Sequence, residues 1–381
     1  MTNAFQHLQT LVGLGPRPIA SPANQAAADY IREGFCAARL EVEEQPYACT
    51  AWEHRFTSLE LDGEMLDCAA NAFSLPCDVT APVIPVASLA DLEVAPAKGK
   101  ILLLYGDLAR TPLAAKSWFL RDERDAHIFD LLLALEPTAM LAPPTATDYF
   151  CHLTEDWELD LAAATVPADV ALHLLHTPEK PLHLVIDARR TPATARNIVA
   201  RTRSTTERRL VLCAHFDTKI NTPGATDNAG GVAALLSLAE RLPRDLPFGL
   251  EFIAFNGEEY LPLGDDEYIR RSEGYFGNIL ACINMDGAGA ALGTNNVTAV
   301  SCSPDLEAKI KAVAQQFSGV VWVDPWPESN HSTFSFRGIP AIPIGSTGMR
   351  ALAHSVNDTV DQVSMAKLEE VIALATALLE S

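Results

Sequence analysis

Basic residues are scarce in this sequence of 381 residues. Only 28 lysines and arginines stand against 49 aspartates and glutamates, which gives a formal net charge of −21. A chain with this excess of negative charge is repelled by the phosphates of nucleic acids and by the headgroups of anionic membranes. The composition therefore predicts that neither nucleic acid nor membrane is a partner, and it leaves the oligomeric state open.

Long apolar runs, paired cysteines and a recognisable leader are also missing. The most apolar stretch, IFDLLLALEPTAML, is interrupted by Asp130, Glu136 and Pro137, so it does not predict a membrane span. The eight cysteines are scattered without a Cys-x-x-Cys pair, which is typical of a reducing compartment. The segment MTNAFQHLQTLVGLGPRP lacks the basic start and apolar core of a signal peptide. Together these absences predict a cytoplasmic protein.

The residues that are present indicate two domains. Apolar residues make up 48% of the chain, which is enough for a sizeable core, and the length suits two domains rather than one. From about residue 191, apolar strands alternate with helical stretches, which is typical of an α/β domain around a largely parallel sheet. Residues 50–190 instead show strand-like pieces between Pro-rich and Ala-rich connectors. The pattern predicts an α/β domain made of 1–49 and 191–381, with a β-rich domain over 50–190 inserted into it.

Residues of metal-binding type follow successive strand or strand–loop ends in the α/β part. Because ligands bind beyond the carboxyl ends of the strands in open α/β sheets, these side chains are expected at one rim. The strand RLVLCAHFDT ends in His215 and Asp217, and the strand LEFIAFNGEE ends in the adjacent Glu258 and Glu259. The remaining candidates are Asp227 at the start of the helix AGGVAALLSLAERL, Asp286 after NILACINMDG, and His354 in the loop after IPAIPIG.

Each of these residues alone has an ordinary structural explanation. A histidine at a strand end is most often satisfied within the fold, Asp227 is a suitable N-cap, and Asp286 is a common turn residue. The combination is not explained in this way, because carboxylates crowded at one sheet edge repel each other unless a cation lies among them. Two histidines with three carboxylates suit two borderline divalent ions, with zinc as the first choice.

The order of these motifs resembles the co-catalytic di-zinc exopeptidase family, which includes bacterial leucyl aminopeptidases, glutamate carboxypeptidase, the glutaminyl cyclases and the transferrin receptor. The matching order is His-x-Asp, Asp-Asn-x-x-Gly, Gly-Glu-Glu, Asn-x-Asp-x-x-Gly and a late histidine followed by Asp-Thr. The opening segment LGPRPIASPANQAAADYI is also similar to that of the family. The resemblance covers about 1–49 and 191–381 and implies a three-layer αβα fold with a mixed, mostly parallel sheet. The region around KGKILLLYG resembles the protease-associated domain that many members carry as an insertion.

Carried over residue by residue, the resemblance implies a complete set of ligands for two Zn²⁺ ions, with Co²⁺ or Mn²⁺ as alternative metals. Asp227 would bridge the two ions. His215 and Asp286 would complete one site, and Glu259 and His354 would complete the other.

Two further residues receive catalytic roles from the resemblance. Asp217 would hold the ring of His215 through its second nitrogen and so fix its tautomer. Glu258 would be the general base for the metal-bound water, because it is adjacent to a ligand without being one. In the family the peptide bond after the bridging aspartate, here Asp227–Asn228, is often cis.

Two segments depart from the family pattern. The family commonly has Ser-Asp-His-x-x-Phe before its last strand, whereas SNHSTF has Asn330 in place of the acid. His331 in this segment either contacts the substrate and donates to the oxyanion or packs the loop. Ala353 stands where an aromatic residue usually precedes the last ligand, which leaves the shape of the substrate pocket open. Arg350 in the same loop either binds a substrate carboxylate or is solvated.

The function implied by the resemblance is that of a zinc-dependent exopeptidase, most simply an aminopeptidase that hydrolyses N-terminal residues from peptides. A carboxypeptidase of the glutamate-releasing type is an alternative, but it needs a basic cluster, of which only Arg350 gives a hint. A glutaminyl-cyclase-like acyl transferase has a single working zinc and a different residue after the bridging aspartate, so the sequence TDNAGG favours the peptidases. A non-catalytic binding protein on the same scaffold would lack ligands, and none of the expected ligands is missing.

Overall fold

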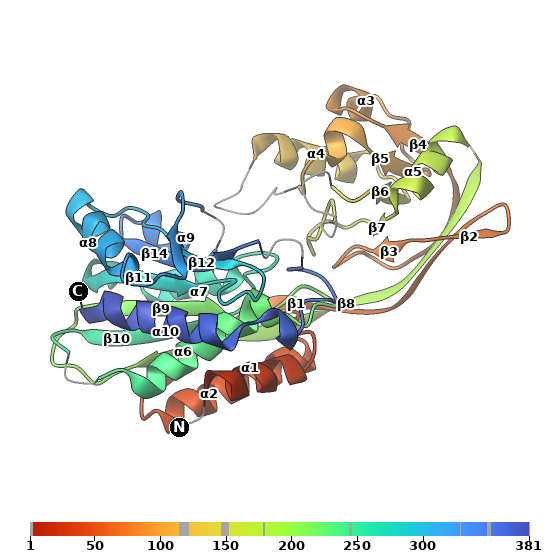
Figure 1. Ribbon diagram of the computed structural model, residues 1–381. Coiled ribbons are helices and arrows are strands. Elements are labelled where there is room, and N and C mark those ends of the chain that lie inside the picture. The colour runs from red at the N-terminus through yellow and green to blue at the C-terminus, as the bar shows by residue number, and fades with distance from the viewer. Residues whose placement is uncertain are drawn as a thin grey trace. The chain divides into compact units, whose positions relative to one another are not determined.

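The computed structural model describes residues 3–113, 122–145, 152–177, 180–243, 246–327, 329–348 and 352–380 (Figure 1). The chain forms two compact units, of which unit 1 comprises Met1–Cys49 with Ala193–Ser381 and unit 2 comprises Thr50–Pro192. Among the described residues, no helix has both the length and the apolar character needed to cross a membrane.

Unit 1 is built on a mixed, mostly parallel sheet. Its strands run in the order β13 (Val320–Trp322), β12 (Thr294–Val297), β14 (Ala341–Thr347), β11 (Ile279–Met285), β9 (Arg209–His215), β10 (Gly249–Phe255) and the last part of β8 (Pro181–Arg201). Strands β14, β11, β9 and β10 are parallel neighbours, whereas β12 is antiparallel to β14 and β8 is antiparallel to β10. The mostly parallel sheet expected from the sequence is therefore confirmed.

The strand β9 is apolar from Leu210 to Ala214 because both of its faces are buried. Its residues Leu210, Leu212 and Ala214 belong to the larger core of unit 1, whereas Val211 and Cys213 belong to a smaller core. Because successive side chains of a strand point to opposite faces, a strand that is covered on both faces needs an unbroken apolar run. The two cores therefore lie on opposite faces of the sheet.

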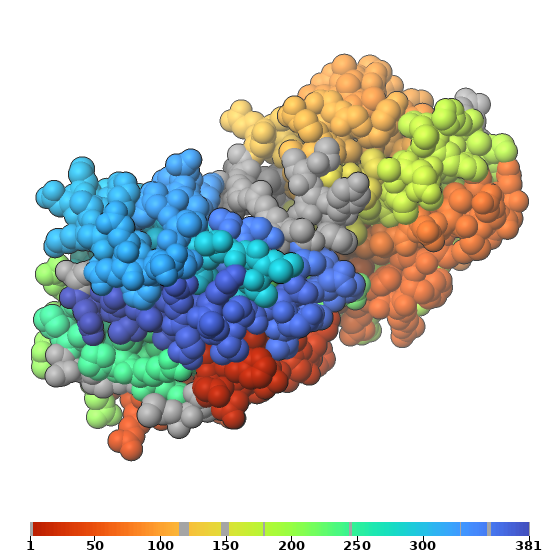
Figure 2. Space-filling model, in the orientation of Figure 1, coloured from red at the N-terminus to blue at the C-terminus, as the bar shows by residue number. Residues whose placement is uncertain are grey.

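Helices cover both faces of this sheet. The larger core is shared with α1 (Ala4–Gly13), α2 (Pro22–Ala37), α6 (Gly230–Arg241), α8 (Pro304–Ala314) and α10 (Met365–Glu380). The smaller core contains Tyr268 from α7 (Leu263–Arg271) and Phe334 from α9 (His331–Ser335). Helix α1 contacts α6 and α10, so the red start and the blue end of the chain lie side by side (Figures 1 and 2). Unit 1 thus has the expected three-layer αβα fold.

The N-terminal helices of unit 1 begin with clear local signals. In α1 the side chain of Asn3 accepts from the backbone of Gln6 in a capping box, and in α2 Ser21 caps a helix that starts with Pro22. Helix α2 ends at Ala37. Short helical turns complete unit 1: η2 (Ala225–Ala229), η3 (Phe276–Asn278) and η4 (Val360–Gln362).

Unit 2 also contains both strands and helices. Its strands are the end of β1 (Glu41–Leu61), β2 (Glu64–Leu66), β3 (Ala69–Ala70), β4 (Cys77–Val86), β5 (Ile101–Leu104), β6 (Ala139–Ala142), β7 (Ala163–Thr165) and the start of β8. Strands β4, β5, β6 and β7 are parallel neighbours in that order. Its helices are α3 (Leu89–Glu93), η1 (Gly106–Ala109), α4 (Glu123–Ala134) and α5 (Ala168–His176). The resemblance of this unit to a protease-associated domain stays a prediction.

Candidate metal centre

The predicted ligands lie beyond the carboxyl ends of the parallel strands in unit 1. His215 is the last residue of β9, Asp286 follows β11 directly, and Glu259 lies in the turn after β10. Asp227 lies in η2, just before α6, and His354 lies in the loop after β14. Because these strands are parallel, their ends meet at one edge of the sheet and bring the side chains together.

Asp227 lies between the two histidines. Its Oδ1 is 3.1 Å from Nε2 of His215, and its Oδ2 is 3.2 Å from Nε2 of His354. Nε2 of His215 is also 3.4 Å from Oδ1 of Asp286, and Nε2 of His354 is 3.1 Å from Oε2 of Glu259. The side chains thus form two groups of three that share Asp227, and the ligand atoms within each group lie within 4.8 Å of one another.

The chemistry of the two groups fits a pair of divalent cations. Each group offers one imidazole nitrogen and carboxylate oxygens from two residues, which is a donor set that zinc accepts. Burial raises the pKa of Glu259, although the charge of His354 opposes this shift. Burial also acts to raise the pKa of Asp227, but hydrogen bonds to His215 and His354 hold it well below its usual range. Buried acids packed this closely are most stable with positive charge among them.

Glu258 lies beside one of these groups without belonging to either. Its Oε2 is 3.9 Å from Nε2 of His215, and 17% of its side chain is exposed. Burial raises the pKa of Glu258 well above its ordinary value, and the negative charges of Asp286 and Glu259 raise it further. The positive charge of His215 acts in the opposite direction but is weaker than the effect of burial. A carboxyl group that binds protons readily at the edge of such a cluster is suited to general base and acid chemistry.

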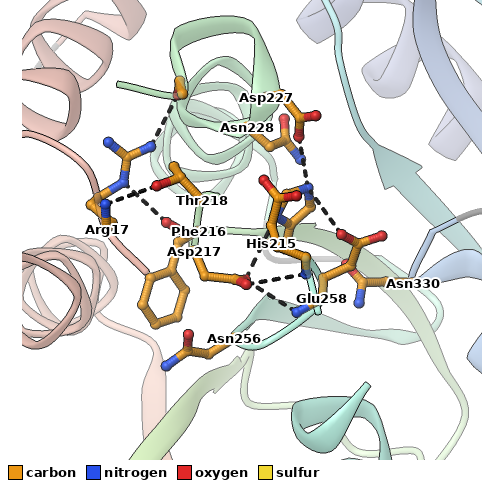
Figure 3. A network of polar contacts seen from close by, with 12 residues as sticks. Arg17, His215, Phe216, Asp217, Thr218, Asp227, Asn228, Asn256, Glu258 and Asn330 are labelled. Atoms are coloured by element: carbon orange, nitrogen blue, oxygen red, sulfur yellow. Dashed lines mark hydrogen bonds and ion pairs between the residues drawn. The ribbon is translucent and has the colours of Figure 1, made fainter. Parts of the chain in front are cut away.

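Asp217 is fully buried and binds two backbone amides (Figure 3). Its Oδ1 accepts from the N–H of Glu258 at 3.3 Å, and its Oδ2 accepts from the N–H of Glu259 at 3.2 Å. The distance from its Oδ1 to Nδ1 of His215 is 3.6 Å, which is an ion-pair distance rather than a hydrogen bond. Asp217 therefore ties the turn that carries both glutamates to the end of β9, a role that the sequence did not indicate.

The segment that carries Asp227 is held by Asp358. The carboxylate of Asp358 accepts from the N–H of Thr226 at 2.8 Å, from its hydroxyl at 2.7 Å, and from the N–H of Asp227 at 3.0 Å. Burial raises the pKa of Asp358 to about 6. The Asp227–Asn228 peptide bond is cis, as the resemblance predicts, and the amide of Asn228 donates to the carbonyl of Met285 at 2.8 Å. The start of α6 is thereby attached to the end of β11.

The loop after β14 brings in the last predicted ligand. His354 has a left-handed backbone with φ of 61°, which is uncommon for a residue other than glycine. Ala353, which stands in place of the family's aromatic residue, is buried. Arg350, which the sequence offers as a candidate for binding a substrate carboxylate, lies outside the described residues.

Position 330, where the family pattern has an acid, is Asn330 in this chain, and its side chain contacts the acid Asp265 instead. Asn330 donates its amide to both carboxylate oxygens of Asp265, at 3.1 and 2.9 Å, and the hydroxyl of Thr333 donates to the same carboxylate. Asp265 lies near the start of α7 and is buried. Burial raises its pKa to about 7, although the hydrogen bonds from Thr333 and Asn330 oppose the shift. The segment SNHSTF is thus fixed by an acid that α7 contributes.

His331 lies within this segment and is completely buried. Its Nε2 is 2.7 Å from the carbonyl oxygen of Trp326, and its ring lies edge-on to that of Trp326 with 4.7 Å between the centroids. Burial lowers the pKa of His331 to about 4, so the ring is neutral at physiological pH. These contacts favour the packing role of the two that the sequence allowed, and a contact with substrate stays a prediction.

Comparisons with known proteins point to one family. Residues 197–379 match the model of peptidase family M28. This part of the chain, just under half of its length, is similar to peptidase family M28. The M28 segment contains all five predicted ligands together with Asp217 and Glu258, whereas 1–49 of unit 1 lie outside it.

Two curated relatives match the chain over much of its length. It is 26% identical over 300 residues to an aminopeptidase of Pseudomonas aeruginosa and 23% identical over 268 residues to the probable lipoprotein aminopeptidase LpqL of Mycobacterium tuberculosis. These alignments cover 70% and 67% of this chain, but 53% and 51% of the two relatives. The chain therefore spans about half the length of the curated relatives it matches.

Solved structures share the whole fold. An aminopeptidase from Aneurinibacillus sp. strain AM-1 matches with a TM-score of 0.77 and 23% identity, covering 99% of this chain and 92% of that one. The zinc aminopeptidase BSAP from Bacillus subtilis matches with a TM-score of 0.78 and 21% identity, covering 99% and 93%. The arrangement of strands and helices in this chain is thus the one found in those proteins.

Proposed function

We propose that the chain is a zinc-dependent exopeptidase, most simply an aminopeptidase that hydrolyses N-terminal residues from peptides. The observation that supports this most directly is the pair of histidine and carboxylate groups that share Asp227, with Glu258 beside them. The M28 segment and the two relatives that are named aminopeptidases point to the same chemistry.

In this proposal Asp227 would be the ligand that two Zn²⁺ ions share. His215 and Asp286 complete the first set of ligands, and Glu259 and His354 complete the second. Zinc in such a site lowers the pKa of a bound water to about 7 and polarises the carbonyl that is attacked.

Glu258 is the proposed general base. Its carboxylate accepts the proton of the attacking water and delivers it to the nitrogen of the leaving amine. Asp217 holds the backbone of Glu258 and Glu259 together, so the base keeps its position relative to a ligand.

Reporter substrates test the proposal. The purified chain is assayed with aminoacyl-p-nitroanilides and with N-blocked peptides that have a free carboxyl terminus, before and after chelation and after addition of zinc. We expect release from the aminoacyl reporters that stops on chelation and returns with zinc.

Other outcomes of this assay reassign the function. Cleavage of the N-blocked peptides alone, from their carboxyl end, would indicate a carboxypeptidase. Cyclisation of N-terminal glutamine without hydrolysis would indicate an acyl transferase. The absence of any chelator-sensitive turnover would indicate a binding protein on this scaffold.

The cytoplasmic location also stays a prediction, which fractionation of cells that express the full-length protein would test.

A further inference from the structure

Arg17, in the segment between α1 and α2, is the largest of the completely buried side chains among the described residues. Its Nε donates to the carbonyl of Phe216 at 3.0 Å, and its terminal nitrogens donate to the carbonyls of Pro223 at 2.8 Å and Gly224 at 3.0 Å. Its remaining acceptors are the carbonyls of Leu11 in α1 and of Gly15 in its own segment. The guanidinium is thus surrounded by main-chain oxygens, three of which belong to the loop after β9 (Figure 3).

The main chain of Arg17 is bound to the same loop. Its N–H donates to the hydroxyl oxygen of Thr218 at 2.8 Å, and its carbonyl accepts from the N–H of Thr218 at 3.3 Å. The carbonyl of Arg17 also accepts from the amide of Asn24, and Asn24 pairs with the side chain of Asn256 directly after β10. Arg17 therefore connects the ends of two central strands of unit 1.

The loop that Arg17 binds lies between two of the proposed ligands. It begins directly after His215 and reaches Gly224, just before η2 with Asp227. Gly224 has a left-handed backbone with φ of 63°, and a Cβ there would lie 2.2 Å from the methyl group of Thr218 and 3.0 Å from a terminal nitrogen of Arg17. The loop is thus closed tightly around the guanidinium, with no room for a side chain at this glycine.

Within the part of the chain that the structure describes, the charge of Arg17 has no direct ionic partner. Among the residues that the structure describes, its hydrogen-bond acceptors are all carbonyls. Burial lowers the pKa of Arg17 to about 10, while the charges of Asp358, Asp217, Glu259 and Asp227 act to raise it. The guanidinium therefore stays protonated at neutral pH. A buried charge without compensation is unfavourable, so this cation depends on the acids of the nearby cluster.

We propose that Arg17 is a positioning residue for the metal centre, because its guanidinium fixes the loop that sets His215 relative to Asp227. This inference rests on the proposed function, since it takes His215 and Asp227 as ligands. It adds a residue from outside the M28 segment to the machinery of the site.

The chain offers a matched control in unit 2. Arg190 likewise donates to main-chain carbonyls, those of Phe73, Trp157 and Leu159, and its side chain is 12% exposed. Unlike Arg17, it also forms an ion pair with Asp160 at 3.0 Å. Both arginines thus hold loops through carbonyl oxygens, but the loop residues that Arg190 holds include none of the proposed ligands. Substitution of Arg190 therefore reports what the loss of such a clamp does to stability alone.

Zinc titration in competition with a fluorescent chelator tests the proposal, together with the visible absorption spectrum of the Co²⁺-loaded chain, which reports the geometry around the metal. We expect Arg17→Met to bind zinc about 10–100-fold more weakly, the usual range for residues that support ligands, and to change the Co²⁺ spectrum. Arg17→Lys keeps the charge but has its donors on one nitrogen, so we expect a smaller loss in the same direction. Arg190→Met should keep the wild-type affinity and spectrum.

The result that overturns the proposal is wild-type zinc affinity and an unchanged Co²⁺ spectrum in folded Arg17→Met. If that variant does not fold, the same result in Arg17→Lys is decisive. An equal loss of affinity in Arg190→Met would also overturn it, since the effect would then follow from destabilisation in general. A wild-type chain that binds no zinc would instead overturn the proposed function, and this inference with it.

Discussion

Both units contain a run of parallel strands, but they differ in the residues placed directly after the strand ends. In unit 1 the ends of β9, β10 and β11 lead directly to His215, the Glu258–Glu259 pair and Asp286. In unit 2, β6 is followed by Pro143, and the acid three residues after β5, Asp107, is paired with Arg124. Among the described residues, both groups of potential metal ligands lie in unit 1. Parallel strands provide an edge at which side chains can meet, and the residues placed there decide whether the edge has chemistry.

The largest expected effect tests whether the unit 1 edge is catalytic. Glu258→Gln should lower kcat by about 10²–10⁴-fold, because the general base is lost while every ligand remains. Zinc stoichiometry and kcat on an aminoacyl reporter are measured in the same preparation. The unit 2 control is Asp107→Asn, which should leave kcat unchanged. Asp107 lies after β5, and its carboxylate is 2.7 Å from Arg124. Loss of zinc from Glu258→Gln would show that the roles of Glu258 and Glu259 are exchanged.

A second prediction concerns the burial of acids around the unit 1 edge. Asp265 has its pKa raised to about 7 by burial, so its favourable contribution to stability is present below its unfolded pKa of about 3.9 and is lost as the pH rises through about 7. Asp265→Asn should remove this loss, which is on the order of 4 kcal/mol in the free energy of unfolding. Urea unfolding of both chains between pH 4 and 7 measures it. Parallel curves for the two chains would contradict the prediction.

A third prediction concerns the support that Asp217 gives to the ligands in unit 1. Asp217→Asn keeps one oxygen acceptor for the amides of Glu258 and Glu259 but loses the second, and it also loses the charge near His215. We expect zinc affinity to fall about 10–100-fold, as for other residues that orient ligands. Zinc titration measures this effect, and the melting temperature shows whether the chain remains folded. Unchanged affinity would restrict Asp217 to a role in folding.

The smallest expected effect concerns the acid that holds the segment SNHSTF. Asn330→Asp places a second acid against Asp265 and removes the amide donors, which should cost about 1–3 kcal/mol of stability. The double variant with Asp265→Asn restores one acid and one amide, so it should recover most of the loss. A double-mutant cycle from thermal unfolding measures the coupling. Additive effects would show that the two positions do not act as a pair.

The fold of unit 1 and the ligand candidates were predictable because their signals are local. The apolar run from Leu210 to Ala214 and the histidine that comes next can be seen within a few residues, as can the Glu258–Glu259 pair after its strand. The parallel sheet then brings these strand ends together without further information. The cis bond before Asn228 was accessible only through the resemblance.

The contacts that support the site were not predictable in this way. Arg17 and Thr218 are 201 positions apart, and Asn24 and Asn256 are 232 positions apart, so neither pairing leaves a local pattern. The acid at Asp265 was missed for a related reason, because the departure at Asn330 is matched on a different helix. For Arg17 the one available signal was the similarity of the opening segment to that of the family.

The position of Asp227 between the two groups has a thermodynamic consequence. When one oxygen of its carboxylate is occupied, the charge and orientation of the other oxygen change, so the two ions of the proposed centre would not bind independently. The coupling free energy is reciprocal: whichever ion enters first alters the affinity for the second by the same factor that the second would impose on the first. A centre built around Asp227 would therefore not titrate as two independent sites.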